Sequence, residues 1–155
     1  MALLADNERA KTMLDELAKE FPEDTQTNLI HMPVILAQIS LNKKDSLRAI
    51  ELLQNLGSYE FANLDCIYER GNAYLALGKG KEAAGEFQKL LDHRALLRND
   101  PKGALAHLGL ARSYVLQGDT AKAKAAYQDF LTLWKDADSD IPIFIAAKAE
   151  YAKLK

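Results

Sequence analysis

Apolar residues recur at intervals of three and four along almost the whole chain, a pattern that predicts amphipathic α-helices. The clearest stretch runs from Tyr68 to Leu91, where two such patterns flank Gly78 and predict a helical hairpin. Gly71 and Ala83 are small at the points where two helices have to approach closely. Because a single hairpin cannot bury both of its apolar faces, the pattern predicts further copies on either side.

The same patterns predict eight helices in all. They are expected over residues 7–20, 28–42, 45–56, 64–77, 80–92, 101–117, 120–135 and 142–154. Asp100-Pro101 offers an N-cap followed by a proline at the first helical position, and Gly118-Asp119 ends one helix and caps the next. Residues 59–63 are expected to form a loop.

The central hairpin returns along the chain. Its marker positions are Gly71, Tyr74, Gly78, Ala83 and Phe87. Residues of the same size class stand 40 positions later, at Ala111, Tyr114, Gly118, Ala123 and Tyr127. A weaker copy stands 34 positions earlier, at Ala37, Ser40, Lys44, Ala49 and Leu53, and a half copy opens the chain at Ala10, Leu14, Leu17 and Pro22. The chain is therefore expected to hold about three full repeats and a partial one.

Gly71 with Tyr74, and Ala83 with Phe87, resemble the tetratricopeptide repeat, which has small-x-x-aromatic in its first helix and Ala-x-x-x-aromatic in its second. The resemblance implies an all-α fold, a right-handed superhelical array of antiparallel helix pairs, or α-solenoid, of about eight helices. One domain, 1–155, would contain the second helix of a truncated repeat (1–22), repeats at 28–57, 64–92 and 100–135, and a C-terminal capping helix (141–155).

The chain departs from the family pattern in three ways. The early Trp of the repeat is replaced by Ile67 or His107, the closing proline survives only as Pro22, and about six extra residues fall near 95–100.

The two ends of the array are expected to differ. Ile145, Ala149 and Tyr151 look fit to cover the carboxyl end, so the last helix is interpreted as a cap. The amino end begins with a lone second helix, which leaves an apolar edge around Leu14 and Leu17. We therefore expect the chain to be a fragment of a longer array, or to exchange this edge with another copy.

Composition narrows the function classes. The 155 residues carry 20 Lys and Arg against 22 Asp and Glu, a net charge of −2, so no overall field favours nucleic acid or anionic lipid. No apolar run approaches the length of a membrane span and the first residues lack the pattern of a secretory signal. A cytoplasmic location is expected for a stand-alone chain, and the location is open if the parent protein is membrane-anchored.

Four features that could carry chemistry fit structural roles better. Gly78-Lys79-Gly80-Lys81 has the wrong spacing for a phosphate loop. Asp136, Asp138 and Asp140 lack the Gly and Glu that complete a calcium loop. His31, His93 and His107 have no metal-ligand spacing, and Cys66 lacks an orienting motif and is expected to be a buried or half-buried thiol. No enzyme activity, cofactor or metal is expected.

The resemblance places ligand contacts on the first helices of successive repeats, which line a concave groove. Carried over by alignment, the groove residues are His31, Val34, Gln38, Leu41, Asp65, Tyr68, Asn72, Leu75, Leu105, Leu108, Arg112 and Val115. The alternative that this face is ordinary solvated surface stays equally open.

Two of these residues are polar groups suited to ligand contacts. Asn72 occupies the Asn position of the family's carboxylate clamp, but Tyr68 replaces its Lys, which disfavours binding of chaperone tails. Asn72 could still hold a peptide backbone, and Arg112 a carboxylate. Replacing either by Ala is expected to weaken capture without lowering the melting temperature.

The expected function is a non-catalytic scaffold that binds a peptide or protein segment in the groove. Residues 99–138 resemble the C-terminal repeat arrays of large bacterial signalling proteins, in which a serine/threonine kinase or a winged-helix DNA-binding domain precedes the array. No kinase motif occurs in this chain. The alternative is self-association, a homo-oligomer formed through the open amino-terminal edge.

Overall fold

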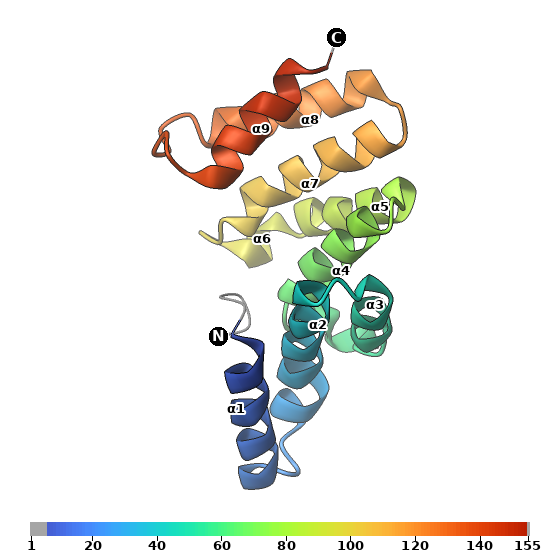
Figure 1. The fold of residues 1–155 in the computed structure, drawn as a ribbon, viewed down its shortest axis with the longest axis vertical. Coiled ribbons are helices and arrows are strands. Elements are labelled where there is room, and N and C mark those ends of the chain that lie inside the picture. The colour runs from blue at the N-terminus through green and yellow to red at the C-terminus, as the bar shows by residue number, and fades with distance from the viewer. Residues whose placement is uncertain (1–5, 155) are drawn as a thin grey trace. The chain divides into compact units, whose positions relative to one another are not determined.

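The computed structural model describes residues 6–154, and this part of the chain consists of helices and their connections (Figure 1). The α-helices are α1 (Asn7–Glu20), α2 (Met32–Asn42), α3 (Ser46–Gln54), α4 (Asp65–Ala76), α5 (Gly80–Asp92), α6 (Arg94–Leu97), α7 (Lys102–Leu116), α8 (Thr120–Leu133) and α9 (Pro142–Ala152). The expected all-α fold is confirmed. The expected segments 1–22 and 141–155 extend to residues 1–5 and 155, which lie outside the described residues.

Three helical segments differ from the expectation by more than a shift of one or two residues at a helix end. The helix expected over 28–42 begins as a π-helix, Gln26–His31, and becomes α2 only at Met32. Pro33, which lacks an amide hydrogen, is the second residue of α2, a place where proline is tolerated. A 3-10 helix, Gly57–Phe61, occupies most of the expected loop. The extra residues near 95–100 contain part of α6, a single turn too short for a periodic pattern to reveal.

The chain forms two compact units, the first ending at Leu77 and the second beginning at Gly78. The first unit contains α1 to α4 and the second contains α5 to α9. The boundary falls inside the expected repeat 64–92, so the two helices of that repeat belong to different units.

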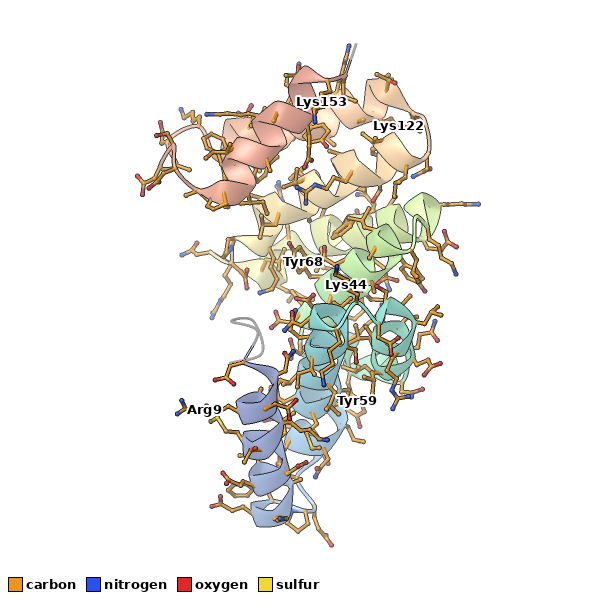
Figure 2. All side chains as sticks on the ribbon, viewed as in Figure 1. Arg9, Lys44, Tyr59, Tyr68, Lys122 and Lys153 are labelled. Atoms are coloured by element: carbon orange, nitrogen blue, oxygen red, sulfur yellow. The ribbon has the colours of Figure 1, made fainter. Side chains whose placement is uncertain are left out.

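In the first unit, α2 and α3 form a hairpin and α4 packs on both, while α1 lies beside α2 (Figure 1). The hairpin turns at Lys44, which adopts a positive φ of 62° and lies where α2 gives way to α3 (Figure 2). Asp45 then caps α3, because its Oδ1 accepts a hydrogen bond from the Arg48 backbone N–H at 3.1 Å. The turn and the cap together fix where the second helix of this hairpin begins.

The core of the first unit consists of small and branched apolar residues, with one buried ion pair at its edge. Ala37, Ala49 and Leu53 have no exposed surface. The Arg70 guanidinium on α4 contacts Glu60 Oε2 at 2.7 Å and donates to the Leu53 carbonyl at 3.1 Å. This arginine therefore joins α4 to the end of α3 and to the 3-10 helix.

In the second unit, α5 packs on α7, α7 pairs with α8, and α9 packs on α8 (Figure 1). The Phe87 ring on α5 is fully buried and lies directly over Gly109 on α7. The hairpin of α7 and α8 turns at Gly118, whose φ of 74° suits glycine, and Asp119 caps α8 through a 3.1 Å hydrogen bond from the Lys122 backbone N–H. The expected turn and cap at Gly118-Asp119 are confirmed.

Of the residues expected to cover α8, only Tyr151 does so, and helix α9 packs on α8 mainly through two others. Phe144 and Ala147 are the buried residues of this helix, whereas Ile145 is 52% exposed and Ala149 is exposed. The expected covering face was therefore wrong for Ile145 and Ala149, because this helix is apolar nearly all round and its pattern does not single out one face. Tyr151 does face α8, where its hydroxyl accepts a 2.8 Å hydrogen bond from Gln128 Nε2.

Candidate functional site

The expected groove residues of the first unit lie on the π-helix, α2 and α4, and α2 contacts both of the others. His31 belongs to the π-helix, α2 carries Val34, Gln38 and Leu41, and α4 carries Asp65, Tyr68, Asn72 and Leu75. Spacings of three and four place each set on one face of its helix. Since α2 and α4 contact each other, the two sets lie on neighbouring helices of this unit.

The side chains on this face differ in exposure. Val34 is 7% exposed and contributes mainly to the core, and His31 is exposed. The other six, Gln38, Leu41, Asp65, Tyr68, Asn72 and Leu75, are half-buried. The accessible surface is therefore a mixture of amides, one carboxylate and apolar side chains.

A buried carboxylate at Glu69 holds the two amides of this surface. Glu69 lies on α4 and is 8% exposed. As placed, Gln38 Nε2 donates to Asn42 Oδ1 at 3.1 Å. With its amide turned so that the nitrogen faces Glu69, Gln38 instead donates from α2 to the two Glu69 oxygens at 2.9 and 3.1 Å. Asn72 Nδ2 lies 3.5 Å from Glu69 Oε2. Glu69 was not among the expected site residues, although its position three residues before Asn72 on one helix is a signal that the sequence contains.

The expected groove residues of the second unit, Leu105, Leu108, Arg112 and Val115, all lie on α7. Leu108 is 1% exposed and belongs to the core, whereas Leu105 and Arg112 are half-buried and Val115 is 44% exposed. Of the four, only Leu105, Arg112 and Val115 thus have surface that a partner could contact.

The Arg112 guanidinium is engaged by a carboxylate of the chain itself. Its Nε and Nη2 donate to Glu150 Oε2 and Oε1 on α9, each at 2.9 Å, and the Tyr127 hydroxyl donates to Glu150 Oε2 at 2.8 Å. Burial by itself raises the pKa of Glu150, but the hydrogen bonds from Arg112 and Tyr127 lower it more, and the net pKa lies below the ordinary value of 4.5. Glu150 was not anticipated, because it stands 38 residues from Arg112 with no local pattern to connect them.

The cysteine, histidine and aspartate residues considered as possible catalytic or metal-binding groups lie in the following surroundings. Cys66 is fully buried, with its Sγ 3.5 Å from the Glu60 carbonyl. His107 Nδ1 lies 3.5 Å from Asp129 Oδ2, and Asp136, Asp138 and Asp140 are exposed. Within residues 6–154, no three His, Cys, Asp or Glu side chains converge as a metal site would require.

In the described part of the chain, none of the helices combines the length and the apolar character needed to cross a bilayer.

Comparison with known proteins gives one match, to a family model. No curated protein and no solved structure matches the chain. The model of the tetratricopeptide repeat matches residues 68–138, which run from α4 through α8 into the connection to α9. The match includes the marker residues Gly71, Tyr74, Ala83 and Phe87 from which the resemblance was inferred. Residues 68–138, somewhat less than half of the chain, are therefore similar to the tetratricopeptide repeat, and repeats of this family generally mediate protein–protein interactions.

Proposed function

We propose that this chain is a non-catalytic protein-interaction module that binds an extended peptide or protein segment. Its binding surface on the first unit comprises the α2 and α4 residues Gln38, Leu41, Tyr68, Asn72 and Leu75. The proposal rests on one observation above all, the position of the buried Glu69 carboxylate within hydrogen-bond reach of the Gln38 and Asn72 amides. Support also comes from the family, whose domains are generally scaffolds without catalytic activity.

Anchored amides suit the recognition of a peptide backbone. An amide presents a donor and an acceptor together, as an extended peptide does at every residue. Because Glu69 restricts both side chains before any partner arrives, less rotamer entropy is lost on binding. The half-buried side chains of Leu41, Tyr68 and Leu75 supply apolar area beside the two amides. The amides would orient the peptide backbone, and the apolar area would add affinity.

A random-peptide display selection tests this function, followed by fluorescence anisotropy with the enriched peptides. We expect Asn72→Ala to weaken their binding by roughly tenfold, the loss of one or two hydrogen bonds. Gln54→Ala is the matched control, because Gln54 is an exposed amide at the end of α3 in the same unit. Peptides that bind the Asn72→Ala protein as tightly as the original would contradict the proposed surface.

A second candidate function is self-association through α1. A hollow of about 270 Å³ on this edge is lined entirely by apolar residues, namely Ala10, Met13, Leu14, Leu17 and Ile35. Met13 is 53% and Leu17 is 38% exposed, so both are accessible to the same edge of a second copy. Sedimentation velocity across a concentration series tests this: Met13→Glu is expected to abolish a dimer, whereas Leu47→Glu, at a 61% exposed leucine on α3, is expected to leave it intact. A protein that stays monomeric at every concentration contradicts this candidate.

We also propose that the module belongs to a larger bacterial signalling protein with a kinase or winged-helix domain. Support comes only from the resemblance of residues 99–138 to the arrays of such proteins. Locating the reading frame tests this origin, and a frame that encodes this chain alone would contradict it.

A further inference from the structure

The second unit contains a pocket of about 780 Å³ that none of the expected groove residues lines. It lies where the extra residues near 95–100 lead from α5 into α7, and the end of α8 forms its opposite wall. Its volume falls in the range of small-molecule sites. The repeat insertion thus adds a concavity separate from the proposed peptide surface.

Two arginines give this pocket an excess of positive charge. Arg94 and Arg98 both line it and are exposed, and neither guanidinium has an ion-pair partner among residues 6–154. Asp100 also lines the pocket, but Lys102 already binds it, with Nζ 3.0 Å from Oδ2 and the backbone N–H 2.8 Å from Oδ1. The two arginine charges are therefore left for a ligand.

One of these arginines, Arg98, has an unusual backbone conformation. Arg98 has φ 52° and ψ −115°, outside the regions that side-chain-bearing residues favour. Such a conformation persists only where the surrounding structure enforces it, and it directs the chain away from α6 beside the pocket.

Part of the remaining wall is apolar and is supported by ring contacts. Trp134 packs against Phe130 with ring centroids 5.0 Å apart and against Phe144 at 6.4 Å. Leu133 beside it is 60% exposed, and Leu97 closes the pocket from α6. Guanidinium groups and an aromatic wall therefore border the same volume.

We propose that this pocket binds an amphiphilic organic anion, with Arg94 and Arg98 holding its carboxylate and Leu97, Leu133 and Trp134 contacting its apolar body. Guanidinium groups bind carboxylates in paired hydrogen bonds, and the apolar wall adds area that a small inorganic anion cannot use. The same chemistry has two sources, a free aliphatic carboxylate and the terminal carboxylate of a peptide with an apolar last residue.

Trp134 is the only tryptophan of the chain, so its fluorescence reports directly on the pocket. The probes are decanoate, its neutral counterpart decan-1-ol, and a hexapeptide ending in leucine with either a free or an amidated C-terminus. We expect a saturable change of Trp134 emission with decanoate, the hexapeptide acid or both, and binding roughly tenfold weaker for the uncharged partner of each pair. Whichever acid binds identifies the source of the carboxylate.

The Arg94→Gln/Arg98→Gln protein is expected to bind the acid as weakly as its uncharged counterpart. The Arg9→Gln/Arg48→Gln protein, which removes two exposed arginines of the first unit, is the charge-matched control and should bind like the original. If the pocket variant loses its helical circular dichroism signal, a salt titration of the original protein takes its place. Raised salt should then weaken the binding of the acid but not the binding of the alcohol. Equal binding of acid and uncharged probe, unchanged binding by the folded pocket variant, or no saturable change with any probe overturns the proposal.

Discussion

Arg112 and Glu150 join α7 to α9 through two parallel hydrogen bonds of 2.9 Å, from Nε to Oε2 and from Nη2 to Oε1. This paired geometry is the strongest arrangement available to the two side chains. The family resemblance predicted that Arg112 could bind a partner's carboxylate, whereas in the structure its guanidinium already binds Glu150. Arg112→Ala is now expected to lower stability as well as to alter the surface, so loss of binding in that variant alone would not identify a ligand contact.

Glu150→Gln is expected to lower the free energy of unfolding by about 1 kcal/mol, because it removes the negative charge to which Arg112 and Tyr127 donate hydrogen bonds. The loss of stability is small because the Arg112 and Glu150 side chains are 35% and 33% exposed, and water weakens an ion pair at that exposure. Urea unfolding followed by Trp134 fluorescence measures the change in the second unit. Glu8→Gln is the control, since its partner Lys43 lies 3.8 Å away with both side chains largely exposed, and it should have almost no effect. Equal stability of the Glu150→Gln and original proteins would contradict the assigned role.

The contact between Gly109 and Phe87 predicts opposite effects for two glycine substitutions. A Cβ at Gly109 would lie 2.6 Å from the Phe87 ring, which is fully buried and would have to shift within the core. Gly109→Ala should therefore cost about 1–3 kcal/mol of unfolding free energy, more than its gain in helix propensity. Gly85→Ala, on the exposed side of α5 with nothing within 4 Å of its Cβ, should stabilise by about 1 kcal/mol. Urea unfolding of both proteins is the measurement, and a stabilised Gly109→Ala protein would show that the two helices are not in close contact.

His107 predicts a pH dependence of stability. Burial lowers its pKa, Asp129 raises it and Arg94 lowers it, with a net result below the ordinary 6.5. The unfolded chain therefore binds a proton more readily, so this contribution to stability is complete above pH 6.5 and is lost as the pH falls through the lower folded pKa. Unfolding free energies measured across this window should decline less in His107→Gln than in the original protein. If the unfolding free energy declines equally in the original and His107→Gln proteins, groups other than His107 cause the acid sensitivity.

Local patterns predicted the helices well where one apolar stripe and a capping residue agreed. Helix α1 begins and ends where expected, as does α5, because each has a single apolar face. Helix α9 has no such stripe, so its start at Pro142 was predictable from the proline while its buried face was not. The π-helix before Pro33 was not predictable either, because a change of helix type over a few residues leaves the apolar pattern almost unchanged.

The candidate site was less predictable, because its decisive contacts join residues far apart in the chain. Alignment to a repeat places side chains on a helix face, yet it does not say which of them the protein itself engages. Leu108 is buried in the core, and Arg112 is held by Glu150 from a helix outside the repeat. Only Glu69 beside Asn72 had a local signal, since the two stand three apart on α4.

The buried ion pair of the first unit predicts a large effect for a single arginine. Arg70 and Glu60 side chains are 7% and 17% exposed, and their closest atoms are 2.7 Å apart. Arg70→Met keeps most of the side-chain volume but leaves the Glu60 carboxylate and the Leu53 carbonyl without the guanidinium, which should cost about 3–5 kcal/mol of unfolding free energy. Arg48→Met is the matched control, because the Arg48–Glu51 pair is 57% and 64% exposed and its loss should change stability by less than about 0.5 kcal/mol. Urea unfolding followed by far-ultraviolet circular dichroism compares the two, and similar small losses would mean that the Arg70–Glu60 pair does not anchor the 3-10 helix to α4.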